Sequence, residues 1–433
     1  MTHAATPAVA SELTPRSVGV ILSSMIGTLF SAQMMAMTVL AVFMGRIAAD
    51  YGWSRAAIGG AITVMSAGIA ISCPCFGPVV DRLGPRRVLL PLVVVQGFLV
   101  ASLSLVGRNL LLFYAAYFLL GLSAPGAVAY SKLISAWFFR RRAIALTGLA
   151  VGVYTSRVVG APVAKRLMDT LGWQHVYWIL AGAVLFISLP TLWAWFVERK
   201  PSDAQATNEL IPDGAPRISP REAIRGRAYW LLLGAQFGGT FASVGMYAHG
   251  AGIMVEHGVD VSLAAWGLSL MALGALAAQI MTGVLLDRFD TPRVILPFAV
   301  VSLASALALR SAHWQPLTLA LLLIFGVACG GQTSMTSYFT TRYFGVRNFS
   351  AIYGTFFPVL WLSTSPAAVI VGAFYDRTRS YDGAMLLVVA ALASAAVFFA
   401  LLEAYPYPVK SQGNEETVAL EQEASAELAT VSD

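Results

Sequence analysis

The sequence predicts an all-α membrane protein, with twelve transmembrane helices arranged as two pseudosymmetric six-helix bundles. Three observations predict this fold class. Hydrophobic residues make up 58% of the 433 positions and charged residues only 12%, against roughly 25% charged residues in soluble domains. Twelve apolar runs follow one another along the chain, and the second half repeats a motif of the first in a constant register.

The composition excludes an ordinary soluble protein. The mean hydropathy is +0.72, and a soluble chain needs a polar exterior that this sequence cannot supply. A bilayer removes that requirement, because side chains that face lipid can stay apolar. The net charge of +6 does not indicate nucleic-acid binding here, since the basic residues sit in short loops between apolar runs.

The twelve runs have the length that a membrane crossing needs, because a hydrocarbon core of about 30 Å takes about 20 residues of helix. They lie at 18–43, 57–80, 88–107, 110–138, 143–164, 176–197, 228–254, 262–286, 293–310, 315–339, 349–374 and 383–403. We therefore expect five regions: an N-terminal tail (1–16), a six-helix bundle (17–198), a linker (199–227), a second six-helix bundle (228–404) and a C-terminal tail (405–433).

The loops predict the orientation. With both termini on one side, that side receives 18 of the 28 Lys and Arg residues and the other side receives 8. Cytoplasmic loops are enriched in Lys and Arg, so we expect both termini in the cytoplasm. Residues 1–15 show no cleavable signal pattern, and the compact loops favour a bacterial inner membrane.

The linker and the C-terminal tail have distinct patterns. Ser219, Pro220 and Glu222 fit a helix-capping box, which predicts a short surface helix before the seventh span. The tail is rich in glutamate and poor in large apolar residues, so we expect it to be disordered.

Catalytic and metal motifs are not evident. Cys73, Cys75 and Cys329 lie inside apolar runs with no neighbouring histidine, and we interpret them as small buried residues rather than metal ligands. No zinc-protease motif, nucleophile elbow or phosphate loop occurs on a span. We predict no enzyme activity and no cofactor.

The internal repeat is the most specific signal. Gly77-Pro-Val-Val-Asp81-Arg82 in the first half matches Gly283-Val-Leu-Leu-Asp287-Arg288 in the second, with an offset of 206 residues. The same offset relates Gly52 to Gly258, Phe138 to Phe344, Arg141 to Arg347, Ala145 to Ala351 and Gly148 to Gly354. A single register over about a hundred residues indicates a duplicated six-helix unit.

The loop around Asp81 resembles the cytoplasmic signature of the major facilitator superfamily. Aromatic and glycine motifs, such as Gly52-Trp53-Ser54-Arg55 and Ile352-Tyr353-Gly354, resemble those of its monocarboxylate porter and oxalate:formate antiporter branch. The resemblance implies the fold of that superfamily, alternating access, and a cytoplasmic gate held by Asp81 and Asp287. The branch usually has a basic residue in span eight, and this chain has none there, so the branch's anion site does not carry over.

Physical reasoning supports the gate. A carboxylate at a helix end can accept backbone N–H bonds from the N-terminus of a neighbouring helix, where the helix dipole favours an anion. Asp81 and Asp287 are placed for this role. Arg82, Arg87, Arg288 and Arg293 are expected to add charge-assisted bonds across the same seam, or else to serve only as topology determinants.

Two cations, Lys132 and Arg157, fall in the interior of the runs, whereas no Asp or Glu does, since Glu198, Glu256 and Glu403 sit at or beyond the run ends. A charge within the bilayer costs roughly 2.5–3.5 kcal/mol on the insertion scale, so each needs a counter-anion, and we expect an anionic substrate to supply it. Arg157 lies deep in span five. The alternatives to anion binding by Arg157 are a structural hydrogen-bonding role and snorkelling toward the membrane surface. Lys132 lies nearer the cytoplasmic end of span four and can also snorkel.

Other polar residues within the spans are candidates for lining a substrate cavity, although each is also compatible with an ordinary helix–helix contact. They are Tyr130, Tyr154, Gln236, His249, Gln332, Tyr338 and Ser363. His249 is a candidate proton carrier, because histidine is the residue type that most often exchanges protons at physiological pH. Two coupling modes are compatible with the sequence: exchange of the substrate against another anion, or co-transport of a proton with the substrate.

The sequence therefore predicts a monomeric carrier for a small organic anion, a mono- or dicarboxylate, with a proton or a counter-anion as coupling ion and no nucleic-acid partner. The alternatives are an efflux carrier for amphiphilic compounds and a transporter-like receptor. Exporters of cations usually need a buried acid, which the spans lack.

Overall fold

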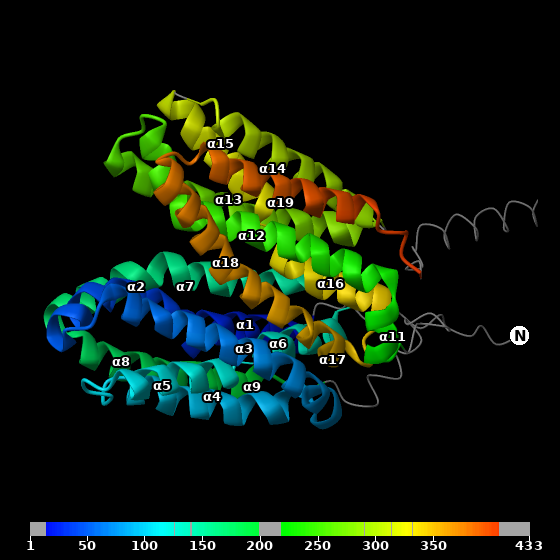
Figure 1. Cartoon of the computed structure of the whole chain (residues 1–433). Helices are drawn as coiled ribbons and strands as arrows, with labels where there is room; N and C mark the ends of the chain where they lie inside the picture. The colour runs from blue at the N-terminus through cyan, green and yellow to red at the C-terminus, as the bar shows by residue number, and fades with distance from the viewer. Residues whose placement is uncertain are drawn as a thin grey trace, which may run out of the picture.

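The computed structural model describes residues 14–124, 126–138, 141–198, 218–289, 291–312, 314–330 and 332–406. Every regular element in these ranges is helical, and their order follows that of the predicted spans (Figure 1). Most of the predicted N-terminal tail, most of the linker and nearly all of the C-terminal tail lie outside the described residues.

The first six spans contain ten helical segments. In chain order these are α1 (Pro15–Leu29), α2 (Ala32–Tyr51), α3 (Arg55–Leu83), α4 (Pro85–Ser102), α5 (Leu110–Leu122), α6 (Gly126–Trp137), α7 (Arg142–Leu171), α8 (Trp173–Ala183), the π-helical η1 (Val184–Ser188) and α9 (Leu189–Trp195).

The second six spans begin after a short helix, α11 (Pro220–Arg225). They consist of α12 (Arg227–Glu256), α13 (Val261–Arg288), the 3-10 helix η2 (Pro292–Ile295), α14 (Leu296–Leu309), α15 (Gln315–Cys329), α16 (Gln332–Phe344), α17 (Phe349–Gly354), α18 (Phe356–Thr378) and α19 (Asp382–Ala400).

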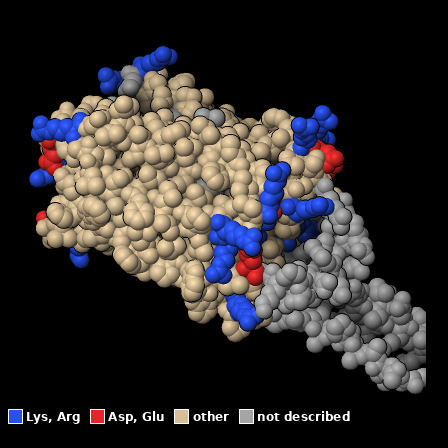
Figure 2. All heavy atoms as spheres, turned by 90° about the horizontal axis from the view of Figure 1, so that it is seen from below, with Lys and Arg blue, Asp and Glu red and all other residues tan. Residues whose placement is uncertain are grey.

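Eight helical segments of the described residues are long and apolar enough to cross a membrane. They correspond to predicted spans two to six, eight, nine and twelve. The other four are the long α12 and the interrupted pairs α1/α2, α15/α16 and α17/α18. On the face that Figure 2 shows, charged side chains gather toward the two ends of the molecule and leave an uncharged region between them, as a bilayer requires.

Four predicted runs are interrupted rather than continuous. Spans four and ten break at equivalent places, after Leu122 and after Cys329, and the intervening Ala124 and Gly330 are 206 residues apart. The sequence supplies a reason at both breaks, because Pro125 follows the first and a second glycine, Gly331, follows Gly330. Proline removes a backbone donor and glycine destabilises a helix interior.

The predicted surface helix is confirmed. The Ser219 hydroxyl accepts from the Glu222 N–H, and the Glu222 carboxylate accepts from the Ser219 N–H at 2.8 Å. The hydrogen bond from the Ser219 backbone N–H to the carboxylate, and after it the contribution of the Ser219 side chain, lower the pKa of Glu222. α11 therefore begins where the capping box placed it.

The repeat is visible in the backbone of the turns as well. Gly52 and Gly258, which are 206 residues apart, follow the first span of each half, after α2 and α12, and have φ angles of 74° and 82°. Glycine adopts this left-handed conformation without the steric cost that other residues incur, so the two equivalent turns both require it.

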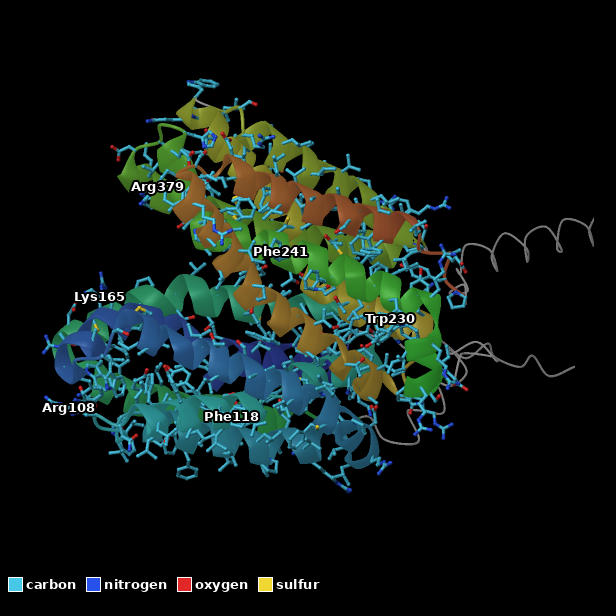
Figure 3. The ribbon with its side chains drawn as sticks, viewed as in Figure 1. Arg108, Phe118, Lys165, Trp230, Phe241 and Arg379 are labelled. Carbon is cyan, nitrogen blue, oxygen red and sulfur yellow. The ribbon has the colours of Figure 1, made fainter. Side chains whose placement is uncertain are left out.

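The helices form two groups, which converge toward the end of the molecule beside α11 and diverge toward the other end (Figure 1). We call the converging end, where α1 begins and α19 finishes, the termini end. Arg108, Lys165 and Arg379 lie at the opposite end, and Trp230 lies near the termini end (Figure 3). Between the groups, α7 packs against α13 and α16, and α3 packs against α17 and α18.

Candidate functional site

Asp287 joins the two bundles at the termini end. It lies in the last turn of α13, and its two carboxylate oxygens accept hydrogen bonds from the backbone N–H groups of Ala143 (2.8 Å) and Ile144 (2.9 Å). These are first-turn donors of α7, which have no partner within their own helix. The helix dipole adds an attraction for the carboxylate. We call this arrangement the Asp287 cap.

Asp81 makes the equivalent connection in the opposite direction. It lies near the end of α3, and its carboxylate accepts from the N–H groups of Ser350 (3.2 Å) and Ala351 (2.8 Å) at the start of α17. We call this the Asp81 cap. The backbone hydrogen bonds expected for aspartates at these helix ends are thus present, and each carboxylate binds a helix of the other bundle.

A lysine distinguishes the two caps. The Lys132 ammonium lies 2.7 Å from the Asp81 carboxylate and donates to the carbonyl of Val80 at 3.2 Å. The side chains of this pair are only 15% and 10% exposed. The residue equivalent to Lys132 is Tyr338, whose hydroxyl donates to the carbonyl of Leu286 at 2.9 Å, and Leu286 is the equivalent of Val80.

The ion pair changes the interpretation of Lys132. The expectation that it needs a substrate as counter-anion does not hold, because Asp81 fills that role in the structure. The pattern of apolar runs placed Asp81 just outside span two, whereas α3 continues through Leu83, which brings its carboxylate beside α6.

The four arginines of the signature loops lie differently from the expectation. Arg82, Arg87, Arg288 and Arg293 are all exposed. Within the described part of the chain, none of their side chains forms an ion pair or a hydrogen bond, so the expected charge-assisted bonds across the seam are not present there. Exposed charges gain little from pairing, since water screens them.

A hydrogen bond joins the bundles between the caps. The hydroxyls of Ser337 in α16 and Ser131 in α6 are 3.2 Å apart, and both residues are 2% exposed. They are 206 residues apart and hence equivalent in the repeat. Two equivalent residues can touch in this way only if they lie at the pseudo-two-fold axis.

Glycines bring the helices of the two bundles close together beside both caps; at the Asp287 cap, a Cβ added to Gly283 would lie 2.5 Å from the Thr147 hydroxyl and 3.1 Å from the Ile144 Cα. At the Asp81 cap, a Cβ added to Gly77 would collide with the carbonyl of Ser350, and one added to Gly354 would lie 2.5 Å from the carbonyl oxygen of Cys73. The backbones of α3 and α17 are therefore in direct contact.

A cavity of about 540 Å³ lies beside the Asp287 cap. It is lined by residues of both bundles: Ile21, Phe138, Arg141, Ile144, Ala145, Val284, Asp287 and Arg288.

The predicted substrate residues do not gather at one described site. The Tyr130 ring packs edge-on against Phe196, with centroids 5.5 Å apart, and its hydroxyl lies against Gly27, all within the first bundle. Tyr338 belongs to the Asp287 cap region through Leu286. Ser363 donates to the carbonyl of Leu360 in its own helix at 2.7 Å.

Gln236 and His249 lie at different levels of α12. Gln236 is 6% exposed and is hydrogen-bonded to Thr336 of α16 and Thr240. His249 lies 3.5 Å from the Tyr381 hydroxyl, close to Gly372 of α18. Tyr154 is half-buried in α7. The helical positions of Arg157 and Gln332 are described, but their side chains are not.

The sequence profile of the Major Facilitator Superfamily matches residues 24–251 and 248–430. The chain belongs to this superfamily. Its members and the relatives below are transporters rather than enzymes, and the protein is a multi-pass membrane protein of that fold.

Among the superfamily members it resembles, a gallate transporter of Pseudomonas putida is 26% identical over 71% of this chain and 77% of the relative. The 4-hydroxybenzoate transporter PcaK of Acinetobacter baylyi is 22% identical over 83% and 86%. A multidrug resistance protein also appears among relatives of similar distance. The structure of the proton:xylose symporter XylE superposes with a TM-score of 0.71 at 10% identity, covering 90% of this chain and 96% of that one.

Proposed function

We propose that this protein is a secondary transporter that moves a small organic anion, a mono- or dicarboxylate, by alternating access. The observation that carries the transport mechanism is the pair of crossed caps. Asp81 of the first bundle binds α17 of the second, and Asp287 of the second binds α7 of the first. Both contacts must break if the bundles are to separate at this end.

The caps suit a gate because they are polar and local. Each consists of two hydrogen bonds between a carboxylate and backbone donors, and such charge-assisted bonds contribute roughly 1.5–3 kcal/mol apiece. Water can replace these partners when the bundles part, so the separation does not leave the groups unsatisfied. We infer that the structure is the state closed at the termini end, and the positive-inside rule places this end in the cytoplasm.

Charge supports an anionic substrate. The spans contain Arg157 without a neighbouring acid in the sequence, whereas the other intramembrane cation, Lys132, is neutralised by Asp81. The names of two relatives, transporters of gallate and 4-hydroxybenzoate, favour aromatic carboxylates as the first compounds to test. We also expect a monomer in the cell membrane, with a proton or a counter-anion as the coupling ion.

The test is thermal stability of the purified protein against a panel of aromatic and aliphatic carboxylates and amphiphilic cations. A ligand at a hundred times its Kd stabilises the folded state by about 2.7 kcal/mol. We expect one class of carboxylates to raise the melting temperature and Arg157→Gln to abolish that shift.

Arg166→Gln is the matched control, since Arg166 is exposed and lies on the same helix. Uptake of the stabilising compound into proteoliposomes then separates a carrier from a receptor. Shifts with amphiphilic cations alone, or carboxylate shifts that survive Arg157→Gln, would contradict the anion site and favour the efflux carrier.

A further inference from the structure

The cavity beside the Asp287 cap lies at the level where two membrane spans end. Arg141 directly precedes α7 and Arg288 is the last residue of α13, and both line the cavity. The apolar stretches of these two helices cover Arg142–Gly160 and Trp266–Arg288. The two arginines therefore stand where the hydrocarbon core of a bilayer gives way to the lipid headgroups.

The cavity has apolar walls and a positively charged edge. Its apolar lining consists of Ile21, Phe138, Ile144, Ala145 and Val284. Asp287 is the one acid among the lining residues, and its carboxylate accepts hydrogen bonds from backbone N–H groups of α7. Two arginines against one acid leave the edge positive, and basic pockets between transmembrane helices are typical sites for anionic lipid headgroups.

The apolar surface around the cavity is open to the outside. Ile144 and Val284 are 40% and 45% exposed, and Ile280, one turn deeper along α13 than Val284, is 48% exposed. In a membrane-spanning bundle, acyl chains cover apolar surface of this kind, because they are as apolar as a leucine side chain. A water-soluble anion would leave this surface uncovered, whereas a phospholipid would cover it with its chains.

The size of the cavity also fits the upper part of a lipid. Its volume of about 540 Å³ lies within the ~300–1,000 Å³ range of ligand sites. A phospholipid spans half of a hydrocarbon core of about 30 Å, so the cavity cannot enclose a whole molecule. It admits the headgroup and the beginning of the chains, and the remainder of the chains would run along the outside of α13.

The two arginines belong to different bundles. The Arg288 guanidinium lies over the ring of Phe289, 5.9 Å from its centroid, and arginine is suited to binding a phosphate through two parallel hydrogen bonds. A phosphate that accepts from both Arg141 and Arg288 would connect the first bundle to the second. Since Ile144 both lines the cavity and donates to Asp287, such a connection would favour the state in which the Asp287 cap is formed.

The repeat provides an internal comparison for this site. The arginines recur at the equivalent positions Arg82 and Arg347, which are also exposed. The apolar wall does not recur, because the positions equivalent to Ile21, Ile144 and Val284 hold Arg227, Ser350 and Pro78. The combination of an arginine pair with an apolar wall is therefore a property of the Asp287 side.

We propose that the cavity beside the Asp287 cap binds an anionic phospholipid, which holds the termini end closed. The phosphate accepts hydrogen bonds from Arg141 and Arg288, and the acyl chains leave the cavity past Val284 and Ile280. The binding itself does not depend on the proposed function, whereas its effect on the conformation rests on alternating access.

The first experiment counts bound lipid. The full-length protein is purified in detergent and titrated with dioleoyl-phosphatidylglycerol or with the zwitterionic dioleoyl-phosphatidylcholine, and native mass spectrometry measures the bound fraction. We expect the anionic lipid to bind about five-fold more tightly, because charge-assisted hydrogen bonds are the stronger ones. Combining Arg141→Gln with Arg288→Gln should abolish this preference. Arg82→Gln with Arg347→Gln is the matched control, since it removes the same charge from the equivalent positions, and it should bind like the parent.

A second variant separates a lipid from a soluble anion. Val284→Ser keeps both arginines but removes part of the apolar wall, so it should weaken phosphatidylglycerol binding several-fold. Glycerol 3-phosphate carries the phosphate without the chains and should not displace the lipid. Displacement by glycerol 3-phosphate, together with unchanged binding to Val284→Ser, would overturn the lipid proposal in favour of a soluble anion. Equal lipid binding to the two double-arginine variants would overturn the location of the site.

The effect on conformation is measured at Ser131, which is 2% exposed between the bundles. Ser131→Cys should react with a soluble maleimide only when the termini end opens, after the labelling of the parent is subtracted. We expect labelling to be several-fold slower in nanodiscs of phosphatidylglycerol than of phosphatidylcholine, and the difference to vanish in Arg141→Gln with Arg288→Gln. Equal labelling despite normal lipid binding would contradict the closing role and leave the lipid site intact. Failure of the carboxylate panel to shift the melting temperature would count against the proposed substrate, and the lipid counts would be unaffected.

Discussion

The Asp81 and Asp287 caps occupy equivalent places in the repeat, yet their surroundings differ. Each carboxylate binds the N-terminus of a helix in the other bundle. Asp81 also carries an ion pair with Lys132, and its seam brings backbones into contact at Gly77 and Gly354. Asp287 has Tyr338 nearby in place of the lysine, and a cavity of about 540 Å³ opens beside it.

Both halves thus keep the hydrogen bonds between the carboxylate and a helix N-terminus. The side chains around these hydrogen bonds differ between the halves, so we expect the two caps to differ in strength. The Asp81 side is a close-packed seam with a partly buried ion pair, whose disruption would leave a charge without a partner. On the Asp287 side, Gly283 meets the Thr147 side chain and the α7 backbone, and a cavity lies next to this contact. We infer that the Asp81 side is the stronger closure.

Replacing Asp81 should have the largest effect. Asp81→Asn leaves the Lys132 ammonium without its counter-ion and weakens two backbone hydrogen bonds. Breaking a buried pair from one side costs ~3–5 kcal/mol, and the partial exposure of this pair places the loss toward the lower figure. We expect a lower melting temperature, strongly reduced transport and normal membrane insertion.

The control for this change is the double variant Asp81→Asn with Lys132→Met. It should recover part of the lost stability, because no unpaired charge remains, and a double-mutant cycle measures the coupling. Wild-type transport in Asp81→Asn would contradict the gate role of the cap.

Asp287→Asn should have a smaller effect on stability. Tyr338 takes the place of Lys132 on this side, and Asn keeps one acceptor oxygen, so the change weakens the charge-assisted bonds to Ala143 and Ile144 by ~1–3 kcal/mol in total. We expect greater labelling of a cysteine placed at the termini end, because the closed state is weakened. A loss of stability equal to that of Asp81→Asn would remove the proposed distinction between the two caps.

Glycine substitutions probe the packing of the seam by the Asp81 cap. Gly77→Ala places a methyl group against the backbone carbonyl of Ser350, which cannot move without shifting α17. Overpacking of this kind costs ~1–3 kcal/mol. Gly160→Ala is the matched control, since its new methyl group would make an ordinary contact of 3.5 Å with Thr38. Equal melting temperatures for the two variants would show that the seam is not close-packed.

The smallest effect is expected at Tyr338. Tyr338→Phe removes only the hydroxyl that donates to the Leu286 carbonyl, and a single neutral hydrogen bond contributes ~0.5–1.5 kcal/mol. The melting temperature should fall by less than in Asp287→Asn. A larger fall would mean that Tyr338, rather than the carboxylate, dominates that side.

The sequence predicted the features that repeat or that have a local pattern. The order of the spans followed from runs of apolar residues, and the capping box at Ser219 located α11. The hydrogen bonds of Asp81 and Asp287 were predicted from their positions at helix ends and from the resemblance of their loops to the superfamily signature. These features depend on neighbouring residues, or on a comparison of the chain with itself.

The Lys132–Asp81 pair could not be predicted in the same way, because the two residues are 51 positions apart and belong to different helices. Their proximity depends on how α3 and α6 pack, which no periodicity encodes. The helix breaks near Phe30 and Thr355 lack an obvious sequence signal, unlike those at Pro125 and Gly330. The exposure of the four loop arginines, Arg82, Arg87, Arg288 and Arg293, also depends on the way the two bundles meet. The roles of Arg157 and of the other predicted substrate-binding residues stay predictions.

The contact between Ser131 and Ser337 has a consequence for the origin of the molecule. In a symmetric homodimer, a residue touches its own copy only on the two-fold axis. Ser131 and Ser337 are equivalent positions of one duplicated unit, and their hydroxyls lie 3.2 Å apart. They preserve the self-pairing that a dimer of six-helix chains would have placed at its centre before the two halves were joined into one polypeptide.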